Sequence, residues 1–382
     1  MTEQPSKNNI PGFSRAKRRL FFLVAIFLSL VVIELGSAII FKVLIPDAAK
    51  ANIRALIGIG DFPVQNLSNS FWHHEFNPAH PNYKNNLNSK GTLGPEFPIE
   101  KLKDELRILC IGDSTVEGFG VEPDKTFPIY LEKILRENIQ HFPDYRTVTV
   151  INGGVGSHNS AFSLAYLAFR LLHFNPDAVI IKSSYNDYLP YIIPGMTYDY
   201  THAFPNPYYQ IKSTSPYWYL ARYSKFFQLV GIVLFRDEVA VPFRNFSGHL
   251  TKDLFQGMDI SSNENKFFVY AENIRSMILL CEGRGMDVFI VDLPTSPNPE
   301  HFGRDRTFGI RYKDLIKRFE GEERRVAREE KVTFIETGSF DQNDFWDHVH
   351  TTASGNRKIA ESVASVLLET LGENNSNSDQ AD

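Results

Sequence analysis

The chain has 382 residues, of which 43% are hydrophobic and 22% charged, and its formal net charge is −5 at pH 7. This apolar content excludes a disordered chain and suffices for one large globular domain and an additional segment. The weak negative charge and the scattered basic residues argue against a nucleic-acid partner. The two cysteines, Cys110 and Cys281, form neither a disulfide framework nor a metal-ligand spacing.

The N-terminal segment has the pattern of a membrane anchor. Residues 20–41 read LFFLVAIFLSLVVIELGSAIIF, and about 20 apolar residues span the hydrocarbon core of a bilayer. Residues 1–19 carry basic side chains directly before this run, whereas the stretch after it is less basic. The positive-inside rule therefore predicts a cytoplasmic N-terminus, a single-pass signal-anchor helix and a main domain outside the cytoplasm. A cleaved signal peptide, with a shorter apolar region, is the alternative.

Glu34 is an acidic residue inside this apolar run. A carboxylate in a membrane span is costly and is a candidate for a functional role. Glu34 lies in the outer half of the predicted span, however, where reaching the surface or staying protonated makes a carboxyl group tolerable.

Residues 42–105 have no sustained period and are predicted to be a connector that packs on the main domain. Within them, Trp72-His73-His74 and His80 raise the question of a metal site. Adjacent histidines in a loop rich in Pro and Asn have poor ligand spacing, so a surface or cleft-lining role is favoured and no metal is expected.

Five short apolar runs then predict the strands of a parallel sheet, because continuous β-branched runs are typical of strands buried on both faces. They are LRILCI (106–111), TVTVI (147–151), AVIIK (178–182), DVFIVD (287–292) and VTFIE (332–336). Helical patterns lie at about 126–139, 157–172, 263–283, 309–330 and 355–371. The alternation predicts an α/β domain over residues 106–371, with helices on both faces of the sheet.

One segment interrupts this alternation. The residues from about 188 to 262 are too many for a simple crossover, and their Tyr- and Pro-rich first part is a candidate cap. The apolar run at 226–235 is too short to span a bilayer, and packing is favoured over an interfacial helix. The polar residues 372–382 are predicted to be a disordered tail.

Polar groups follow four of the five predicted strands. They are Gly112-Asp113-Ser114, then Asn152 to Ser157, then Ser184-Tyr185-Asn186-Asp187, and finally FWDHVH, which ends at His350. Because the carboxyl ends of parallel strands meet at one edge of a sheet, these groups are expected to form one site.

The chemistry of these groups is that of nucleophilic catalysis. Ser114 needs a base to take its proton, His350 is the candidate base, and Asp347 is close enough in sequence to orient its imidazole. His348 is the alternative base. Donors for an oxyanion hole are the backbone N–H of Ser114, that of Gly156 or Ser157, and the side chain of Asn186.

Two other interpretations compete with catalysis. Ser114 alone is also suited to be a plain helix cap. The glycines at 153, 154 and 156 suggest a dinucleotide loop, but Asn159 stands where such a loop needs glycine, so no cofactor is expected. The G-x-S-x-G elbow of α/β-hydrolases is absent.

The ordered pattern of GDS, a glycine turn, x-N-D and D-x-x-H resembles the SGNH (GDSL-type) hydrolases, from about Asn86 to Leu371 apart from the insert. The resemblance implies a three-layer α/β/α sandwich of flavodoxin-like type and metal-free ester hydrolysis. It makes Ser114 the nucleophile, His350 the base and Asp347 its orienting partner. Two positions depart from the family: Ser184 replaces a glycine, and Ser157 stands where the oxyanion glycine is expected, one residue after Gly156.

The expected function is ester hydrolysis through an acyl-enzyme outside the cytoplasmic membrane, on acyl groups of a cell-surface glycan or lipid. An O-acyltransferase that uses the same residues on a cell-surface polysaccharide is an alternative, which a water-excluding aromatic cap would favour. A non-catalytic binding or assembly protein with the same fold is a third hypothesis, for which the shifted glycine argues slightly.

Overall fold

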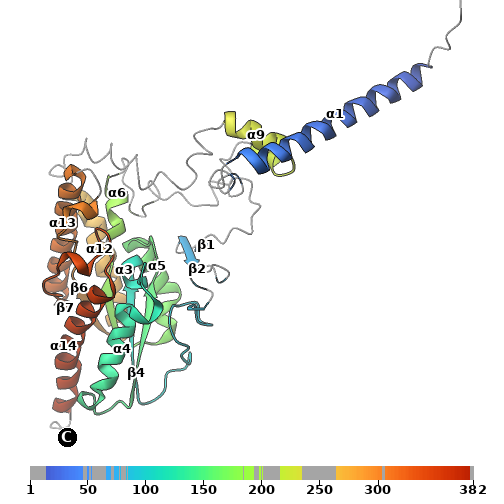
Figure 1. Cartoon of the computed structure of the whole chain (residues 1–382). Coiled ribbons are helices and arrows are strands. Elements are labelled where there is room, and N and C mark those ends of the chain that lie inside the picture. The colour runs from blue at the N-terminus through green and yellow to red at the C-terminus, as the bar shows by residue number, and fades with distance from the viewer. Residues whose placement is uncertain are drawn as a thin grey trace, which may run out of the picture. The chain divides into compact units, whose positions relative to one another are not determined.

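The computed structural model describes residues 14–45, 66–69, 73–76, 85–183, 185–192, 216–234, 264–302 and 306–378, together with residues 50, 53, 78, 83, 198 and 200 (Figure 1). By its internal contacts the chain divides into two compact units. The first holds Met1–Phe62 and Ser213–Asn245, and the second holds Pro63–Lys212 and Phe246–Asp382. The predicted connector, residues 42–105, and the predicted insert, residues 188–262, each have residues in both units.

The second unit is built on a five-stranded parallel sheet in the order β4-β3-β5-β6-β7. Its strands are β3 (Glu105–Gly112), β4 (Thr147–Gly154), β5 (Ala178–Lys182), β6 (Asp287–Val291) and β7 (Thr333–Ile335). Each lies at a predicted apolar run, and β3 and β5 are buried along their whole length. The prediction of a parallel sheet is therefore confirmed.

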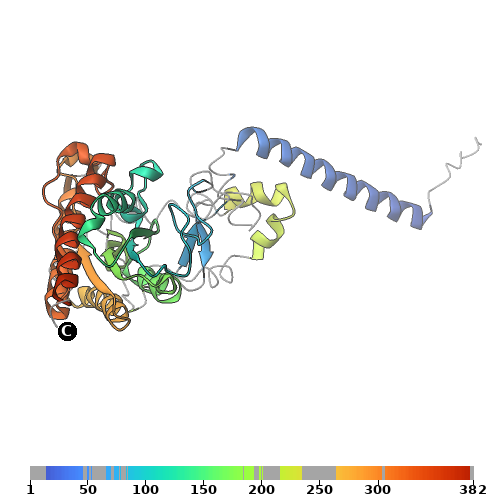
Figure 2. The same ribbon diagram turned by 90° about the horizontal axis from the view of Figure 1, so that it is seen from below.

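Helices cover both faces of this sheet (Figures 1 and 2). On one face, Leu109, Ile181 and Ile290 pack against α5 (Ser160–Phe169), α12 (Glu264–Glu282) and α13 (Arg306–Glu330). On the other, Ile108, Ile180 and Phe289 pack against α4 (Phe127–Glu137) and α14 (Ala353–Ser378). Side chains alternate between the two cores because successive residues of a strand point to opposite faces. The fold is the expected three-layer α/β/α sandwich.

Two elements differ from the predictions. A small antiparallel pair, β1 (Asn66–Asn69) and β2 (His73–Phe76), lies in the stretch that was expected to be irregular. Its strands have four residues each and are rich in Asn, Ser and His, so they carry little β signal. The helix α14 continues past Leu371 to Ser378, because polar residues without proline do not end a helix whose earlier turns are packed. Residues 379–382 of the predicted tail lie outside the described chain.

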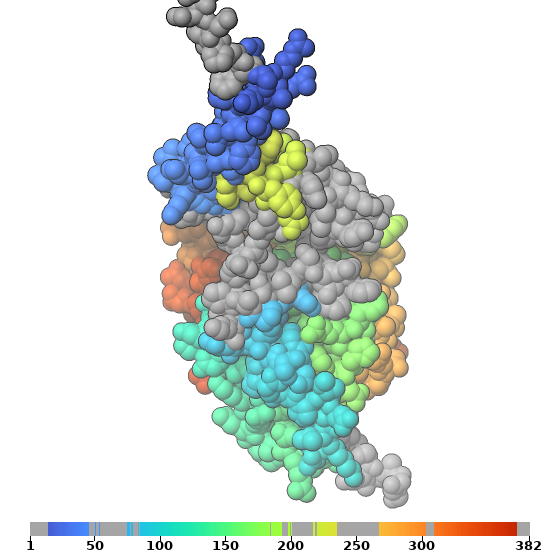
Figure 3. All heavy atoms as spheres, turned by 90° about the vertical axis from the view of Figure 1, so that its right-hand side faces the viewer, coloured from blue at the N-terminus to red at the C-terminus, as the bar shows by residue number. Residues whose placement is uncertain are grey.

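The first unit contains three described helices: α1 (Arg15–Leu44), α8 (Pro216–Ala221) and α9 (Lys225–Leu234). Among the described residues, α1 is the helix long and apolar enough to cross a membrane. A small core joins the three helices around Phe41, Ile53 and Ala221. Figure 3 shows α8 and α9, in yellow, against the blue atoms of α1.

Candidate active site

Ser114 is the first residue of the short helix α3 (Ser114–Glu117), directly after β3. Asp113 caps this helix: its Oδ1 accepts hydrogen bonds from the backbone N–H and the hydroxyl of Thr115, at 2.8 and 2.9 Å. A side chain at Gly112 would place its Cβ 1.9 Å from the carbonyl oxygen of Lys182, so only glycine allows β3 and β5 to approach so closely here. These contacts fix the position of Ser114 at the carboxyl edge of the sheet.

His350 connects Ser114 to Asp347. Its Nε2 lies 2.8 Å from Ser114 Oγ, and its Nδ1 lies 2.6 Å from Asp347 Oδ2. Asp347 Oδ1 also accepts the backbone N–H groups of Val349 and His350, at 2.9 and 2.7 Å. The structure thus brings together the three predicted residues, although 236 positions separate Ser114 from His350.

The electrostatics around Asp347 favour its ionised form. Burial alone would raise the pKa of this carboxyl group, but the hydrogen bond and charge of His350 and the two backbone donors outweigh burial and lower the pKa to about 2. Asp347 is therefore a carboxylate at neutral pH, able to hold the proton on Nδ1 and leave Nε2 toward Ser114.

His348, the alternative base, lies elsewhere. Its ring packs against the rings of Tyr312 and Phe302, with centroid distances of 5.1 and 5.7 Å. Burial lowers its pKa, which favours the neutral imidazole. The geometry therefore favours His350 over His348 as the partner of Ser114.

The expected oxyanion donors occupy the turn after β4 and the start of the segment after β5. Ser157 is exposed and has a φ of 65°, a left-handed conformation that glycine adopts most readily. This serine thus takes the backbone conformation of the glycine that the resemblance predicts there. Asn186 donates its side-chain amide to the carbonyl oxygen of His158 at 2.9 Å, which leaves its second amide hydrogen for another acceptor.

Glu117 is a buried carboxyl group beside the site that the sequence analysis did not single out. Its Oε1 accepts the hydroxyl hydrogen of Tyr83 at 2.8 Å, and the backbone N–H of Gly156 also hydrogen-bonds to this carboxyl group. Burial raises the pKa of Glu117 to about 7. A Cβ at Gly156 would lie 2.6 Å from Glu117 Oε2 and 3.9 Å from Ser114 Cβ, so glycine lets the turn approach both groups.

Two aromatic side chains flank His350 and were also missed. The Trp346 ring stacks on His350 at 5.2 Å with an interplanar angle of 16°, and the Phe119 ring lies 5.1 Å from His350. Both remain partly exposed, at 43% for Trp346 and 36% for Phe119. Position 346 directly precedes Asp347, which is the signal that could have identified it.

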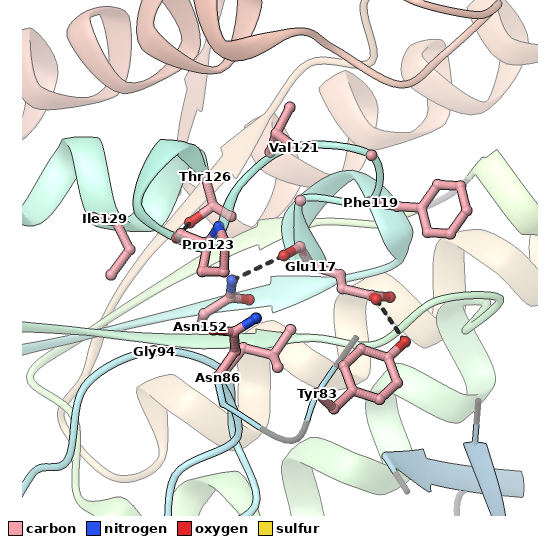
Figure 4. Close-up of a pocket in the computed structure, with 13 residues that line it drawn as sticks. Tyr83, Asn86, Gly94, Glu117, Phe119, Val121, Pro123, Thr126, Ile129 and Asn152 are labelled. Carbon is pink, nitrogen blue, oxygen red and sulfur yellow. Dashed lines mark hydrogen bonds between the residues drawn. The ribbon is translucent and has the colours of Figure 1, made fainter. Parts of the chain in front are cut away.

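A pocket of about 460 Å³ adjoins this site, and Figure 4 shows the residues that line it. Glu117 and Phe119 contribute to its wall beside the triad. The opposite side comes from the chain around Tyr83 and Leu93, and Leu93 bridges to Asn152 in β4. The pocket is lined by both polar and apolar groups. Glu117 lies between this pocket and the turn at Gly156.

Asp187, the acidic residue of the predicted x-N-D block, holds the segment that carries Asn186 in place through hydrogen bonds. It is buried and accepts hydrogen bonds from the backbone N–H of Ser160 at 2.9 Å, from the Ser160 hydroxyl at 2.5 Å and from the Tyr200 hydroxyl at 3.0 Å. Burial raises its pKa to about 7. Asp187 thereby ties the segment after β5 to the start of α5.

Several residues considered from the sequence cannot be placed. Ser184 and His80 lie outside the described residues, and the side chains of His73 and His74 are not described. Within the described part of the chain, no group of three or more His, Cys, Asp or Glu side chains is arranged to hold a metal ion.

The sequence matches the model of the GDSL-like lipase/acylhydrolase family over residues 110–358. This match includes Ser114, Glu117, Gly156, Asp347 and His350. Among curated proteins, none is similar enough in sequence to match the chain.

Three solved structures with low identity also align with the chain. A putative GDSL-like lipase from Parabacteroides merdae has 14% identity and a TM-score of 0.42, covering 71% of this chain and 100% of its own. The acetylxylan esterase Axe2 from Geobacillus stearothermophilus has 13% identity and a TM-score of 0.39, with coverage of 69% and 95%. TesA has 18% identity and a TM-score of 0.37, with coverage of 68% and 97%.

The family match covers more than half of the chain, and it runs from β3 into α14 across all five strands of the sheet. The chain therefore belongs to the GDSL-like lipase/acylhydrolase family and is an enzyme that hydrolyses esters.

Proposed function

We propose that the chain is a serine ester hydrolase that works through an acyl-enzyme, with Ser114 as nucleophile, His350 as base and Asp347 as the residue that orients His350. The observation that carries the proposal is the continuous path from Ser114 Oγ through both nitrogens of His350 to Asp347, at 2.8 and 2.6 Å. Hydrogen-bond distances of this kind allow a proton to move from the hydroxyl group to the imidazole during attack.

In the first half-reaction, Ser114 Oγ attacks the ester carbonyl carbon while His350 Nε2 takes the hydroxyl proton. The Asp347 carboxylate stabilises the resulting imidazolium, and the tetrahedral intermediate collapses as His350 returns the proton to the departing alcohol. In the second half-reaction, water attacks the acyl-enzyme and gives its proton to His350. The acid then leaves, and Ser114 regains its hydrogen.

The oxyanion is stabilised by the backbone N–H groups of Ser114 and Ser157 and by the side chain of Asn186. Ser157 is favoured over Gly156 because the N–H of Gly156 is directed to Glu117, whereas Ser157 is exposed. Removal of one oxyanion donor typically lowers kcat by about 10²–10³. Ser157 keeps a usable backbone N–H because its side chain does not alter that donor.

The substrate is an acyl ester of a cell-surface glycan or lipid, and the active site lies outside the cytoplasmic membrane. Support comes from the apolar helix α1 behind a basic N-terminal segment, which fits a single-pass signal anchor. The partly exposed rings of Trp346 and Phe119 beside His350 add aromatic surface on which the apolar face of a sugar or an acyl chain can pack.

The test is turnover of a short-chain aryl ester by the full chain in detergent, with and without a sugar acceptor. Hydrolysis without an acceptor, lost in Ser114→Ala and kept in the control Ser362→Ala, supports the proposal. Ser362 lies in α14, where its hydroxyl bonds to the carbonyl oxygens of Thr337 and Lys358. Acyl transfer that requires the sugar would identify a transferase, and equal behaviour of wild type and Ser114→Ala would contradict catalysis by Ser114.

A further inference from the structure

Glu34 of α1 is bonded to the beginning of α9. Its Oε2 accepts the hydroxyl hydrogen of Ser224 at 2.7 Å and the backbone N–H of Phe226 at 3.3 Å, and its Oε1 accepts the backbone N–H of Lys225 at 2.5 Å. The first N–H groups of a helix have no partner within the helix, and a carboxylate there also interacts favourably with the helix dipole. The acidic residue of the apolar helix is thus an N-terminal cap for a second helix.

The helix α9 packs Phe227, Leu229 and Ile232 against the small core, but it also buries a polar side chain and exposes apolar ones at its end. Its polar residue Gln228 is 3% exposed and donates its side-chain amide to the carbonyl oxygen of Ala221 at 2.8 Å. The apolar residues Val233 and Leu234 are 77% and 66% exposed. In water, large apolar side chains are buried and amides face the solvent, so this arrangement fits an apolar surrounding.

The contact between α1 and α9 has the composition of a helix pair in a membrane. The buried positions include the small residues Ser37 on α1 and Gly231 on α9, which let two helices approach closely. Phe41 closes the contact, and the ammonium group of Lys225 lies 4.5 Å from the centroid of its ring.

We propose that α8 and α9 form a hairpin seated in the outer membrane–water interface beside α1, with the apolar side chains of α9 among the phospholipid acyl chains. The proposal rests on the anchoring of α1 in the membrane, which is part of the proposed function. At 1.5 Å per residue, Glu34 lies about 10 Å along α1 from Phe41, the last residue of the apolar run. Interfacial helices are buried about 5–10 Å deep, which agrees with this position.

The turn between α8 and α9 suits the same location. Arg222 and Tyr223 are both exposed there. Arginine reaches headgroup phosphates with its long side chain, and tyrosine is enriched at membrane interfaces. The hairpin also requires that α1 is retained, because removal of α1 as a signal peptide would take away Glu34, Ser37 and Phe41 together.

The experiment uses the full chain in vesicles of phosphatidylethanolamine and phosphatidylglycerol, with one added cysteine that carries an environment-sensitive fluorophore. Val233→Cys is the test position, Leu28→Cys in α1 is the lipid reference, and Phe169→Cys in α5 is the water reference. The wild type controls for labelling of Cys110 and Cys281, which are both buried. The probe at 233 should be quenched by bromines on the acyl chains, and iodide quenching there should be several-fold weaker than at 169.

Two outcomes would overturn the proposal, and they are distinguishable. If iodide quenches the probe at position 233 as strongly as the probe at position 169, while the probe at position 28 stays protected from iodide, the hairpin does not lie in the interface. The membrane anchor would be unaffected by this result. If iodide quenches the probe at position 28, α1 does not span the membrane, and the membrane location in the proposed function is rejected as well. Turnover of the ester is unaffected by either result, since it depends on the second unit.

A substitution at the cap tests the role of Glu34 separately. In the Val233→Cys background, Glu34→Ala removes the acceptor for the N-terminus of α9, so iodide quenching at 233 should rise toward the value at 169. Ser29→Ala is the matched control, because the Ser29 hydroxyl donates within α1, to the carbonyl oxygen of Ala25 at 2.8 Å. Unchanged quenching in Glu34→Ala would contradict the capping role.

Discussion

The sheet of the second unit and the helix α9 of the first unit differ in which side chains they leave exposed. In the sheet, Ile108, Ile180 and Ile290 are fully buried between two layers of helices. In α9, Gln228 is buried and Val233 is exposed. Within the described chain, the sheet buries its apolar side chains, whereas α9 leaves Phe226, Val233 and Leu234 exposed. This difference is the one that the proposed seat of α9 among acyl chains requires, since large apolar side chains are mostly buried in water.

The residues of the proposed chemistry all lie in the second unit. The carboxyl edge of its sheet holds Ser114 and Asp347 each within hydrogen-bond distance of His350. The first unit carries no comparable arrangement among its described residues, and the carboxylate of Glu34, which is partly buried, caps a helix. Substitutions in the two units should therefore affect different measured properties.

The largest effect is expected at the base. His350→Ala removes the acceptor for the Ser114 proton, and loss of such a base lowers kcat by about 10⁴–10⁶. The measurement is kcat for hydrolysis of an aryl ester by the full chain in detergent. His141→Ala, on a 3₁₀ turn after α4, is the matched histidine control and should keep wild-type kcat. A decrease in kcat smaller than tenfold for His350→Ala would contradict its assignment as base.

Asp347→Asn should lower kcat by about 10⁴, because an amide no longer holds the imidazole tautomer or stabilises the imidazolium. Since the pKa of Asp347 is about 2, the wild type should not lose activity through protonation of this residue between pH 5 and pH 8. Asp341→Asn, in the capping box of the turn before Phe345, is the control for a structural carboxylate. Equal kcat values for the two variants would count against the proposed role of Asp347.

Truncation of apolar side chains should separate the two units. Ile180→Ala creates a cavity in the sheet core and should lower the free energy of unfolding by about 2–5 kcal/mol. Val233→Ala shortens a side chain that is 77% exposed, so in detergent it should change the unfolding free energy by less than about 0.5 kcal/mol. Chemical denaturation of both variants in the same micelles checks this. Similar losses of unfolding free energy in the two variants would show that Val233 is packed in the protein, which would contradict the difference between the sheet and α9.

The last prediction concerns the dependence of stability on pH. Glu117 has its pKa raised from 4.5 to about 7 by burial, so the folded state binds its proton more tightly than the unfolded state. Its contribution therefore makes the protein less stable as pH rises from 4.5 to 7, by about 3 kcal/mol. Glu117→Gln should flatten this part of the stability curve, while the contribution of Asp187 remains. Parallel curves for wild type and variant between pH 5 and pH 8 would refute this account.

Most of the sheet unit could be predicted from the sequence. The strands β3 to β7 are continuous β-branched runs, a strong signal, and the polar residues after them lie at one edge because parallel strands place them there. That same rule predicted Ser114, Asp347 and His350 as neighbours. The proposed preference for Ser157 over Gly156 as oxyanion donor could not be derived from the sequence, because it rests on the exposure of Ser157 and on the hydrogen bond of Gly156 to Glu117.

Other features depend on contacts between distant residues and left no local signal. Glu117 is followed by a left-handed glycine in a helix of four residues, so its burial against Tyr83 had no periodicity to indicate it. Glu34 was interpreted from its depth in the span alone, but its partners Ser224 and Lys225 are 190 and 191 residues away. The run at 226–235 was predicted to pack, and most of it forms α9, which packs Phe227, Leu229 and Ile232 in the small core but leaves Val233 and Leu234 exposed.

The central claim, that Ser114 is the nucleophile, is tested most directly by labelling with a fluorophosphonate. The full chain in detergent is incubated with the reagent, and the modified peptide is identified by mass spectrometry. The account predicts one phosphonate per chain on Ser114, with labelling strongly slowed in His350→Ala and absent in Ser114→Ala. Labelling of another residue, or no labelling of the folded wild type, would contradict it.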